Sequence, residues 1–405
     1  MKHILTFAFV ILSFQLTYTQ EAKGKYVLMV SLDGFRWDYP DMYDTPFLDS
    51  LAKAGVKAKS LQPSYPSKTF PNHYTMATGL YPDHHGIVNN SFYDPETKRE
   101  YAILKRNAVK DGTFYGGEPM WVTAEKQGIK SATYFWVGSE AAVQGVMPTI
   151  TKYYDASHAY GSRIDSVMKW FSKPYNERPG LVMLYFDEPD ASGHKYGPAH
   201  TKTGKVVQRL DSLIGVLFKK SENLNIKDSL NIIITSDHGM ADLSEKKQIF
   251  LKNLIHDSLL IRIEGSNPVY NLEVKDEYLE LVHEKLSGIE HLHVWKPDEI
   301  PEKLHYGTNP RTLDINIVAE EGWSIHTEKP SGYSAGTHGY IPQNRSMHAI
   351  FYASGPSFLS DKEIDTFENV DLYNLVCFLL DLEPAQNDGS FERIKPMLNA
   401  DKFLE

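Results

Sequence analysis

Thr69 combines a reactive hydroxyl with a predicted position at the start of a helix. Pro71 follows closely, and the chain then continues without a helix breaker until Gly79. Pro in the first turn and Gly just past the end are typical of helices. A helix N-terminus favours negative charge, and a hydroxyl there can be ionised by a metal and attack phosphorus. Threonine is also a favoured helix cap, which is the better explanation if Thr69 is taken alone.

Acidic and imidazole side chains elsewhere in the chain make a catalytic role for Thr69 more plausible than a role as a helix cap alone. Taken alone, each of these motifs is a weak signal for a metal site. An Asp-His-Gly triplet after a strand can be only a turn, and an acid four residues before a histidine can be only a surface pair. Together they form a mixed carboxylate and imidazole set, which suits Zn²⁺ better than Mg²⁺ or Ca²⁺ and is large enough for two ions. The candidate ligands are Asp33, Asp190, His194, Asp237, His238 and His338.

Three continuous apolar runs, at 26–32, 180–186 and 230–236, lead into these acids. Such runs are typical of strands buried on both faces. Because helical patterns alternate with them, we expect an α/β fold with a mostly parallel central sheet and helices on both faces. Ligands collect at the carboxyl ends of strands in such sheets, so residues that follow separate strands can converge there.

The helical patterns include 45–54, 163–171, 202–219 and 370–380. The stretch 257–330 differs, since short strands flank one helix, and we interpret it as a small α+β insertion. The remainder of 25–405 is expected to form one catalytic domain.

The 405 residues include 41% hydrophobic residues, which is ample for a core, and carry a formal charge of −10. That charge argues against binding polymeric nucleic acid, but bound cations would still permit a small anionic substrate. A basic start and an apolar run at 4–14 predict a signal peptide over 1–19, too short for a stable membrane span. Cys377 is the only cysteine, so no internal disulfide forms. Export without disulfides favours a bacterial periplasm, or secretion from a bacterium, over a eukaryotic ectodomain.

Several motifs occur in a fixed order along the chain. They are Ser31-Leu-Asp-Gly-Phe-Arg36, Lys68-Thr-Phe-Pro-Asn-His73, Gly86-Ile-Val-Asn-Asn90, Glu188-Pro-Asp-Ala-Ser-Gly-His194, Ser236-Asp-His-Gly239, Gly336-Thr-His-Gly339 and Glu383-Pro-Ala-Gln-Asn-Asp-Gly389. Through them the chain resembles the nucleotide pyrophosphatase/phosphodiesterase family of the alkaline phosphatase superfamily. The resemblance covers nearly all of the chain after the predicted signal peptide.

The resemblance implies two zinc ions and a covalent mechanism. One zinc would be held by Asp190, His194 and His338. The other would be held by Asp33, Asp237 and His238, with the Thr69 oxygen completing its shell. Thr69 would be the nucleophile that forms a nucleotidyl-threonine. Asn90 would bind a nonbridging phosphoryl oxygen together with the backbone N–H of Thr69 or Phe70.

The resemblance also places Phe70, Trp136 and Tyr154 in a nucleobase slot. Without it, core packing is the better explanation of these aromatic residues. Stacking suits any base, so the base preference is expected to be loose. Val137 departs from the family, whose members often carry Pro beside this Trp.

The expected activity is hydrolysis of nucleotide phosphodiester and phosphoanhydride bonds, as in ATP, dinucleoside polyphosphates or NAD-like molecules, to nucleoside 5′-monophosphates. A zinc alkaline phosphatase is an alternative, although residues 137–140 offer no cation for a monoester's extra charge. A choline-phosphodiester or lysophospholipid hydrolase is another, but no acidic-aromatic cage is evident. A binding protein without activity would lack a ligand or the nucleophile, and none is missing.

Overall fold

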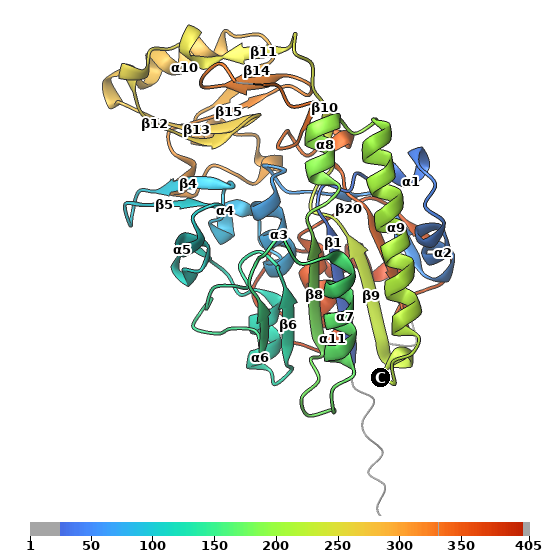
Figure 1. Cartoon of the computed structure of the whole chain (residues 1–405). Coiled ribbons are helices and arrows are strands. Elements are labelled where there is room, and N and C mark those ends of the chain that lie inside the picture. Colours follow the sequence, from blue (N-terminus) through green and yellow to red (C-terminus); the bar gives the residue numbers. More distant parts are fainter. Residues whose placement is uncertain (1–24, 331, 400–405) are drawn as a thin grey trace, which may run out of the picture.

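The computed structural model describes residues 25–330 and 332–399 (Figure 1). The predicted signal peptide at 1–19 lies outside the described residues. In the part of the chain that the structure describes, no helix has the length and apolar character that a membrane span needs.

An eight-stranded mostly parallel sheet forms the centre of the fold, as predicted. Its strand order is β19-β2-β18-β9-β1-β8-β6-β7. The parallel run comprises β9 (Leu230–Thr235), β1 (Tyr26–Leu32), β8 (Leu181–Phe186), β6 (Ser131–Tyr134) and β7 (Ile150–Lys152). β18 (Phe351–Ser354) is antiparallel to both neighbours, and β2 (Val56–Ala58) pairs in parallel with β19 (Lys362–Ile364).

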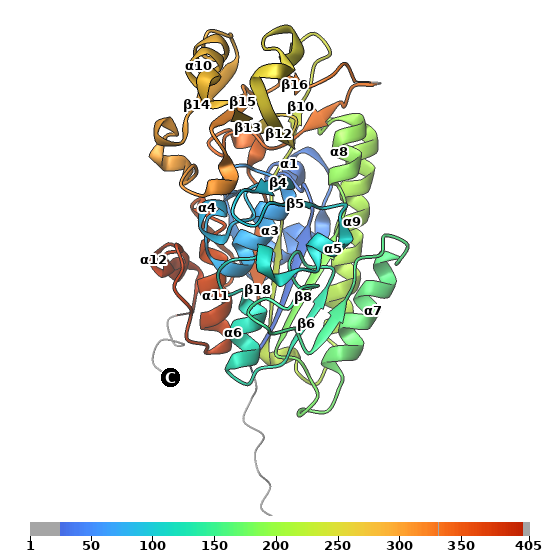
Figure 2. The same cartoon turned by 90° about the vertical axis from the view of Figure 1, so that its left-hand side faces the viewer.

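Helices cover both faces of this sheet (Figures 1 and 2). One face packs against α2 (Pro46–Ala54), α7 (Tyr160–Phe171) and α9 (Thr201–Ser221). The other packs against α3 (Thr69–Thr78), α6 (Met120–Lys126) and α11 (Asp371–Leu380). Alternate residues of β1 enter the two cores, as the two-residue repeat of a strand requires. Val27 belongs to the α3 side and Leu28 to the α9 side.

A smaller antiparallel sheet, β12-β13-β15-β14, lies within residues 257–330. Its strands are β12 (Leu260–Ser266), β13 (Val269–Val274), β15 (Ile315–Ala319) and β14 (Leu292–Trp295), with α10 (Leu279–Ser287) beside β14. This sheet has its own apolar core, to which Ile249 and Ile325 also contribute. The Lys68 ammonium donates to the Asn267 carbonyl at 2.6 Å, which ties the β12–β13 turn to the start of α3.

Shorter α-helices and strands lie between these elements. The helical ones are α1 (Tyr39–Met42), α4 (Pro82–His85), α5 (Arg106–Val109), α8 (Asp190–Tyr196) and α12 (Phe391–Ile394). The extended ones are β3 (Leu61–Gln62), β4 (Ser91–Asp94), β5 (Arg99–Ala102), β10 (Ala241–Asp242), β11 (Gln248–Phe250), β16 (Ser324–His326), β17 (Gly336–Thr337) and β20 (Phe367–Glu368).

Candidate active site

The carboxyl ends of the parallel strands bring the predicted acids together. Asp33 directly follows β1, and Asp237 follows β9 after one residue. Asp190 begins α8, and its backbone N–H donates to the Asp33 carbonyl at 2.9 Å. Gly34 makes this approach possible, because its φ is +69° and an added Cβ would lie 2.9 Å from the Asp190 Cα. The turn after β1 therefore requires glycine.

The six predicted ligands form two groups of three. In each group the candidate ligand atoms all lie within 4.8 Å of one another. The groups are adjacent, since the rings of His238 and His338 stack with their centroids 3.5 Å apart. The first group is Asp190, His194 and His338, and the second is Asp33, Asp237 and His238.

The backbone fixes the tautomer of each histidine. The Nδ1 atoms lie next to backbone carbonyl oxygens, at 2.8 Å for His238, 2.8 Å for His338 and 2.9 Å for His194. A carbonyl only accepts, so Nδ1 carries a proton, and in the neutral ring Nε2 then presents a lone pair. This is the second-sphere arrangement found around metal-ligating histidines.

Those Nε2 lone pairs face carboxylate oxygens. His238 Nε2 lies 3.1 Å from Asp237 Oδ2 and 3.4 Å from Asp33 Oδ1. Asp190 Oδ1 lies 3.4 Å from the Nε2 of His194 and 3.5 Å from that of His338. Two acceptors repel each other at such distances unless a cation lies between them.

The facing oxygens are also without partners. Asp33 Oδ1, Asp190 Oδ1 and Asp237 Oδ2 are buried and accept no hydrogen bond from any described residue. Burial, followed by repulsion from Asp237 and Asp190, raises the pKa of Asp33 well above its usual range. Buried carboxylate oxygens that accept no hydrogen bond are costly, and metal coordination removes that cost. The donor set therefore fits two metal ions.

Thr69 is the first residue of α3, and Gly79 ends that helix with a φ of +68°. The Thr69 hydroxyl oxygen lies 3.2 Å from His238 Nε2, so it adjoins the second group. His73, four residues later on the same helix face, was not singled out from the sequence. Its Nδ1 lies 2.9 Å from the Thr69 carbonyl and 3.2 Å from Asp237 Oδ2, and its Nε2 lies 2.8 Å from the Ser31 hydroxyl. His73 thus connects α3 to the acids.

Asn90 lies beside the start of α3. The Phe70 backbone N–H donates to Asn90 Oδ1 at 2.9 Å. Because that partner must be the amide oxygen, the two N–H donors of the amide are on the other atom. The Phe70 N–H is occupied by this bond, whereas the amide N–H groups of Asn90 do not take part in it.

A pocket of ≈ 350 Å³ extends from the acids to the predicted aromatic slot. Asp33, Thr69 and Asp190 line it, as do Phe70, Trp136 and Tyr154. Trp136 is only 1% exposed and donates its indole N–H to the His73 carbonyl at 3.1 Å, whereas Tyr154 is 41% exposed. Phe70 and Tyr154 therefore offer the larger stacking surfaces.

The pocket also contains an ion pair that the sequence did not reveal. Arg106 pairs with Glu140, whose Oε1 accepts the Tyr154 backbone N–H at 2.9 Å. Phe135 and Asp187 line the same pocket. These residues come from separate segments and carry no motif, so only the folded chain brings them together.

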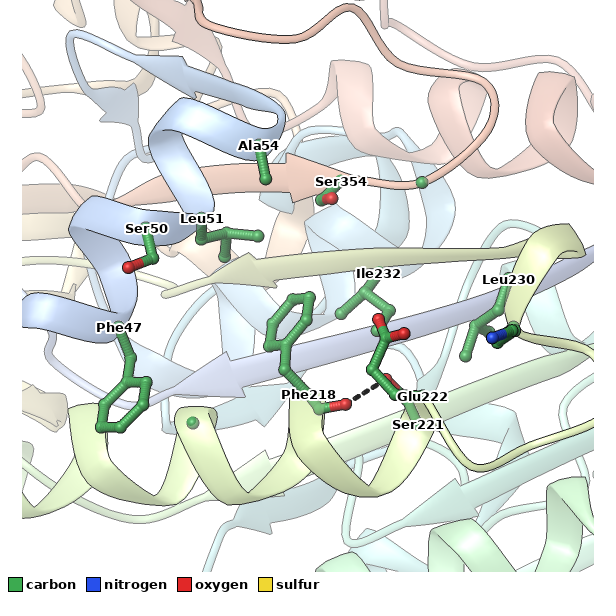
Figure 3. A pocket seen from close by; sticks show the side chains of 13 residues that line it. Phe47, Ser50, Leu51, Ala54, Phe218, Ser221, Glu222, Leu230, Ile232 and Ser354 are labelled. Carbon is green, nitrogen blue, oxygen red and sulfur yellow. Dashed lines mark hydrogen bonds between the residues drawn. The ribbon is translucent and has the colours of Figure 1, made fainter.

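A second hollow lies between α2 and α9, at the amino end of β9 (Figure 3). Phe47, Leu51 and Phe218 contribute to its wall, and the Ser221 hydroxyl donates to the Phe218 carbonyl there. None of the described residues that line it is a histidine or an aspartate. Glu222 is the one acid among these described residues, which is too few ligands for a metal site.

Known proteins resemble the chain over most of its length. The family model for type I phosphodiesterase / nucleotide pyrophosphatase matches residues 27–341. Venom phosphodiesterase CdcPDE of Crotalus durissus collilineatus is 36% identical over 92% of this chain and 46% of its own length. Human ectonucleotide pyrophosphatase/phosphodiesterase family member 1 is 37% identical over 92% of this chain and 41% of its own. The chain thus spans about half the length of these curated relatives.

A solved structure of a family member also matches the chain over nearly all of its length. Murine ectonucleotide pyrophosphatase/phosphodiesterase 5, an inactive threonine-to-alanine variant in complex with AMP, superposes with a TM-score of 0.89 at 33% identity. The match covers 93% of this chain and 100% of the murine chain. The predicted alkaline-phosphatase-like fold is confirmed, and the chain belongs to the type I phosphodiesterase / nucleotide pyrophosphatase family.

Proposed function

We propose that this protein is a two-zinc hydrolase that cleaves nucleotide phosphodiester and phosphoanhydride bonds to nucleoside 5′-monophosphates through a covalent intermediate on Thr69. One observation carries the proposal. Three carboxylate oxygens that accept no hydrogen bond face three imidazole Nε2 atoms, and the Thr69 hydroxyl lies 3.2 Å from one of those nitrogens. That arrangement combines a cation site with a nucleophile.

The two groups would each hold one zinc ion, because their carboxylate and imidazole donors suit that metal. Bound zinc supplies Lewis acidity that lowers the pKa of an adjoining hydroxyl and stabilises charge on phosphoryl and leaving oxygens. Asp190, His194 and His338 would form the site on the leaving-group side, while Asp33, Asp237 and His238 would form the site beside Thr69.

The chain's own residues would act in two steps. The Thr69 oxygen attacks phosphorus, the bond to the leaving oxygen breaks, and a nucleotidyl-threonine forms. Water then attacks the same phosphorus, releases the nucleoside 5′-monophosphate and restores the Thr69 hydroxyl. The Asn90 amide donates to a nonbridging oxygen, while Phe70 and Tyr154 stack against the base.

The charge of the pocket favours diesters over monoesters. Among the described residues that line it, Arg106 is the cation, and Glu140 neutralises its charge. A monoester dianion needs more positive charge than a diester monoanion. The alkaline phosphatase alternative is therefore the weaker one.

The names of the relatives support a nucleotide substrate and an exported protein. The murine relative carries AMP, and others are named as venom phosphodiesterases and ectonucleotide enzymes. With the predicted signal peptide, these names support export of this chain. Its single cysteine is our reason for proposing a bacterial periplasm, or secretion from a bacterium, as its destination.

Three chromogenic substrates test the proposal. The purified protein with zinc is expected to hydrolyse a nitrophenyl ester of TMP faster than nitrophenyl phosphate or nitrophenyl phosphocholine. A dominant rate on nitrophenyl phosphate would make it a phosphomonoesterase, and a dominant rate on nitrophenyl phosphocholine would make it a choline-phosphodiester hydrolase. Either result would overturn the proposal.

A further inference from the structure

Asp187 is an acid in the substrate pocket with no part in the proposed chemistry. It follows β8 directly, lines the pocket and keeps 30% of its side chain exposed. We propose that Asp187 accepts a hydrogen bond from a ribose hydroxyl and so makes the enzyme prefer ribonucleotides to deoxyribonucleotides. This inference rests on the proposed function, since it assumes that the pocket takes a nucleotide.

The order of the strands places Asp187 between the two ends of the pocket. β8 lies between β1, which leads to Asp33, and β6, which leads to Phe135 and Trp136. Leu32 pairs with Phe186, so Asp33 and Asp187 leave neighbouring strands at the same level. Neighbouring strands are about 4.8 Å apart, so roughly 10 Å separates the acids of β1 from the aromatic residues after β6.

A nucleotide must cross β8 to span this distance. With phosphorus beside Thr69 and Asp33, and with the base beside Phe70 and Tyr154, the ribose comes next to the end of β8. Asp187 also lies close enough to Tyr154 to raise the pKa of its hydroxyl, second to burial. A nucleotide bound in this way would present its ribose hydroxyls to Asp187.

The Asp187 side chain is held in place by a buried arginine. Arg163 is 0% exposed, and its Nη1 lies 3.1 Å from Asp187 Oδ1. The same Nη1 donates to the Tyr185 carbonyl at 3.0 Å, and Nε donates to the His158 carbonyl at 3.0 Å. The guanidinium also packs over the rings of Phe135 and Tyr160, at 4.9 and 4.7 Å from their centroids.

These contacts fix the direction of the Asp187 carboxylate but do not occupy all of its hydrogen-bond acceptor positions. Tyr160 contacts the carboxylate as well. A carboxylate has about four acceptor positions, so capacity remains for a hydroxyl from the pocket side. The simpler explanation is that Asp187 only neutralises Arg163. A counter-ion alone would affect ribonucleotides and deoxyribonucleotides equally, whereas a ribose contact would not.

The experiment compares kcat/KM for ATP, 2′-deoxy-ATP and 3′-deoxy-ATP. The wild type is expected to prefer ATP to at least one deoxy analogue by about tenfold or more, the effect of one hydrogen bond to a charged group. Asp187→Ala is expected to bring that ratio close to one by slowing ATP alone. Asp187→Asn, which keeps an acceptor for Arg163 and so protects the fold, is expected to lower the ratio partway.

Asp155→Asn is the matched control, because Asp155 is an exposed acid near the pocket that does not line it. It is expected to leave the ratio unchanged. Equal wild-type rates on all three nucleotides would overturn the inference. So would Asp187 variants that slow ATP and both deoxy analogues alike. Each of these results leaves the proposed function standing, whereas a wild type that hydrolyses no nucleotide would remove both.

Discussion

Replacing Asn90 by Asp tests how the pocket stabilises charge on phosphorus. The change alters one atom of the side chain and keeps its size. The remaining carboxylate oxygen still accepts the Phe70 N–H, the contact that measures 2.9 Å here. The local backbone should therefore hold, while the N–H donor offered to the phosphoryl oxygen is replaced by an anionic oxygen.

The expected cost follows from the lost donor. Removing one oxyanion-hole donor typically lowers kcat by about 10²–10³, or about 2.7–4 kcal/mol. Repulsion between the new carboxylate and the substrate anion adds to this loss. We expect kcat/KM on a nitrophenyl TMP ester to fall at least a hundredfold, with an unfolding midpoint within a few degrees of the wild type.

Asn107→Asp is the control for added charge. Asn107 is exposed on α5, close to Arg106 of the pocket wall, but it does not line the pocket. Its kcat/KM is expected to stay within about twofold of the wild type, since screened surface charges interact weakly. If Asn90→Asp retained more than a tenth of wild-type kcat/KM, or if Asn107→Asp lost as much, the Asn90 amide would not be the phosphoryl donor.

Three further predictions concern the nucleophile, the metals and the stability. Thr69→Ala should fold and bind zinc but lose most turnover, and wild-type rates in that variant would refute the covalent mechanism. Chelation should abolish hydrolysis, and added zinc should restore it in a steady-state assay; activity that persists in metal-free protein would contradict the two-zinc proposal. Burial lowers the pKa of His85 to about 3 in the folded protein. Between about pH 6.5 and pH 3, His85 is therefore protonated in the unfolded chain but neutral in the folded one. The free energy of unfolding is therefore unaffected by His85 above about pH 6.5, and His85 lowers it by about 1.4 kcal/mol per pH unit as the pH falls from there toward 3. Urea unfolding at pH 7 and pH 5 should show a smaller decline in His85→Gln, and an equal decline would mean that His85 is charged when folded.

The sequence predicted the parts of this structure that depend on local patterns. The continuous apolar runs gave β1, β8 and β9, and Thr69 with Gly79 marked the ends of α3. The acids and histidines could be named because the acids and His238 closely follow strands, His194 lies four residues after Asp190, and His338 lies between two glycines. Their grouping into two sets of three depended on the family resemblance.

Features that depend on tertiary contacts could not be predicted from the sequence. The antiparallel direction of β18 is set by its neighbours and not by its own residues. The hairpin β4–β5 and the one-turn helix α4 lie where little periodicity exists to detect. His73 was visible as a motif residue, but its bridge from Thr69 to Asp237 appears only in the fold.

The central claim is that two zinc ions lie beside the Thr69 hydroxyl. Anomalous diffraction at the zinc edge, from crystals of the protein grown with AMP, tests it most directly. We expect two peaks, one among Asp190, His194 and His338 and the other among Asp33, Asp237 and His238. The absence of a peak from either group would contradict the account.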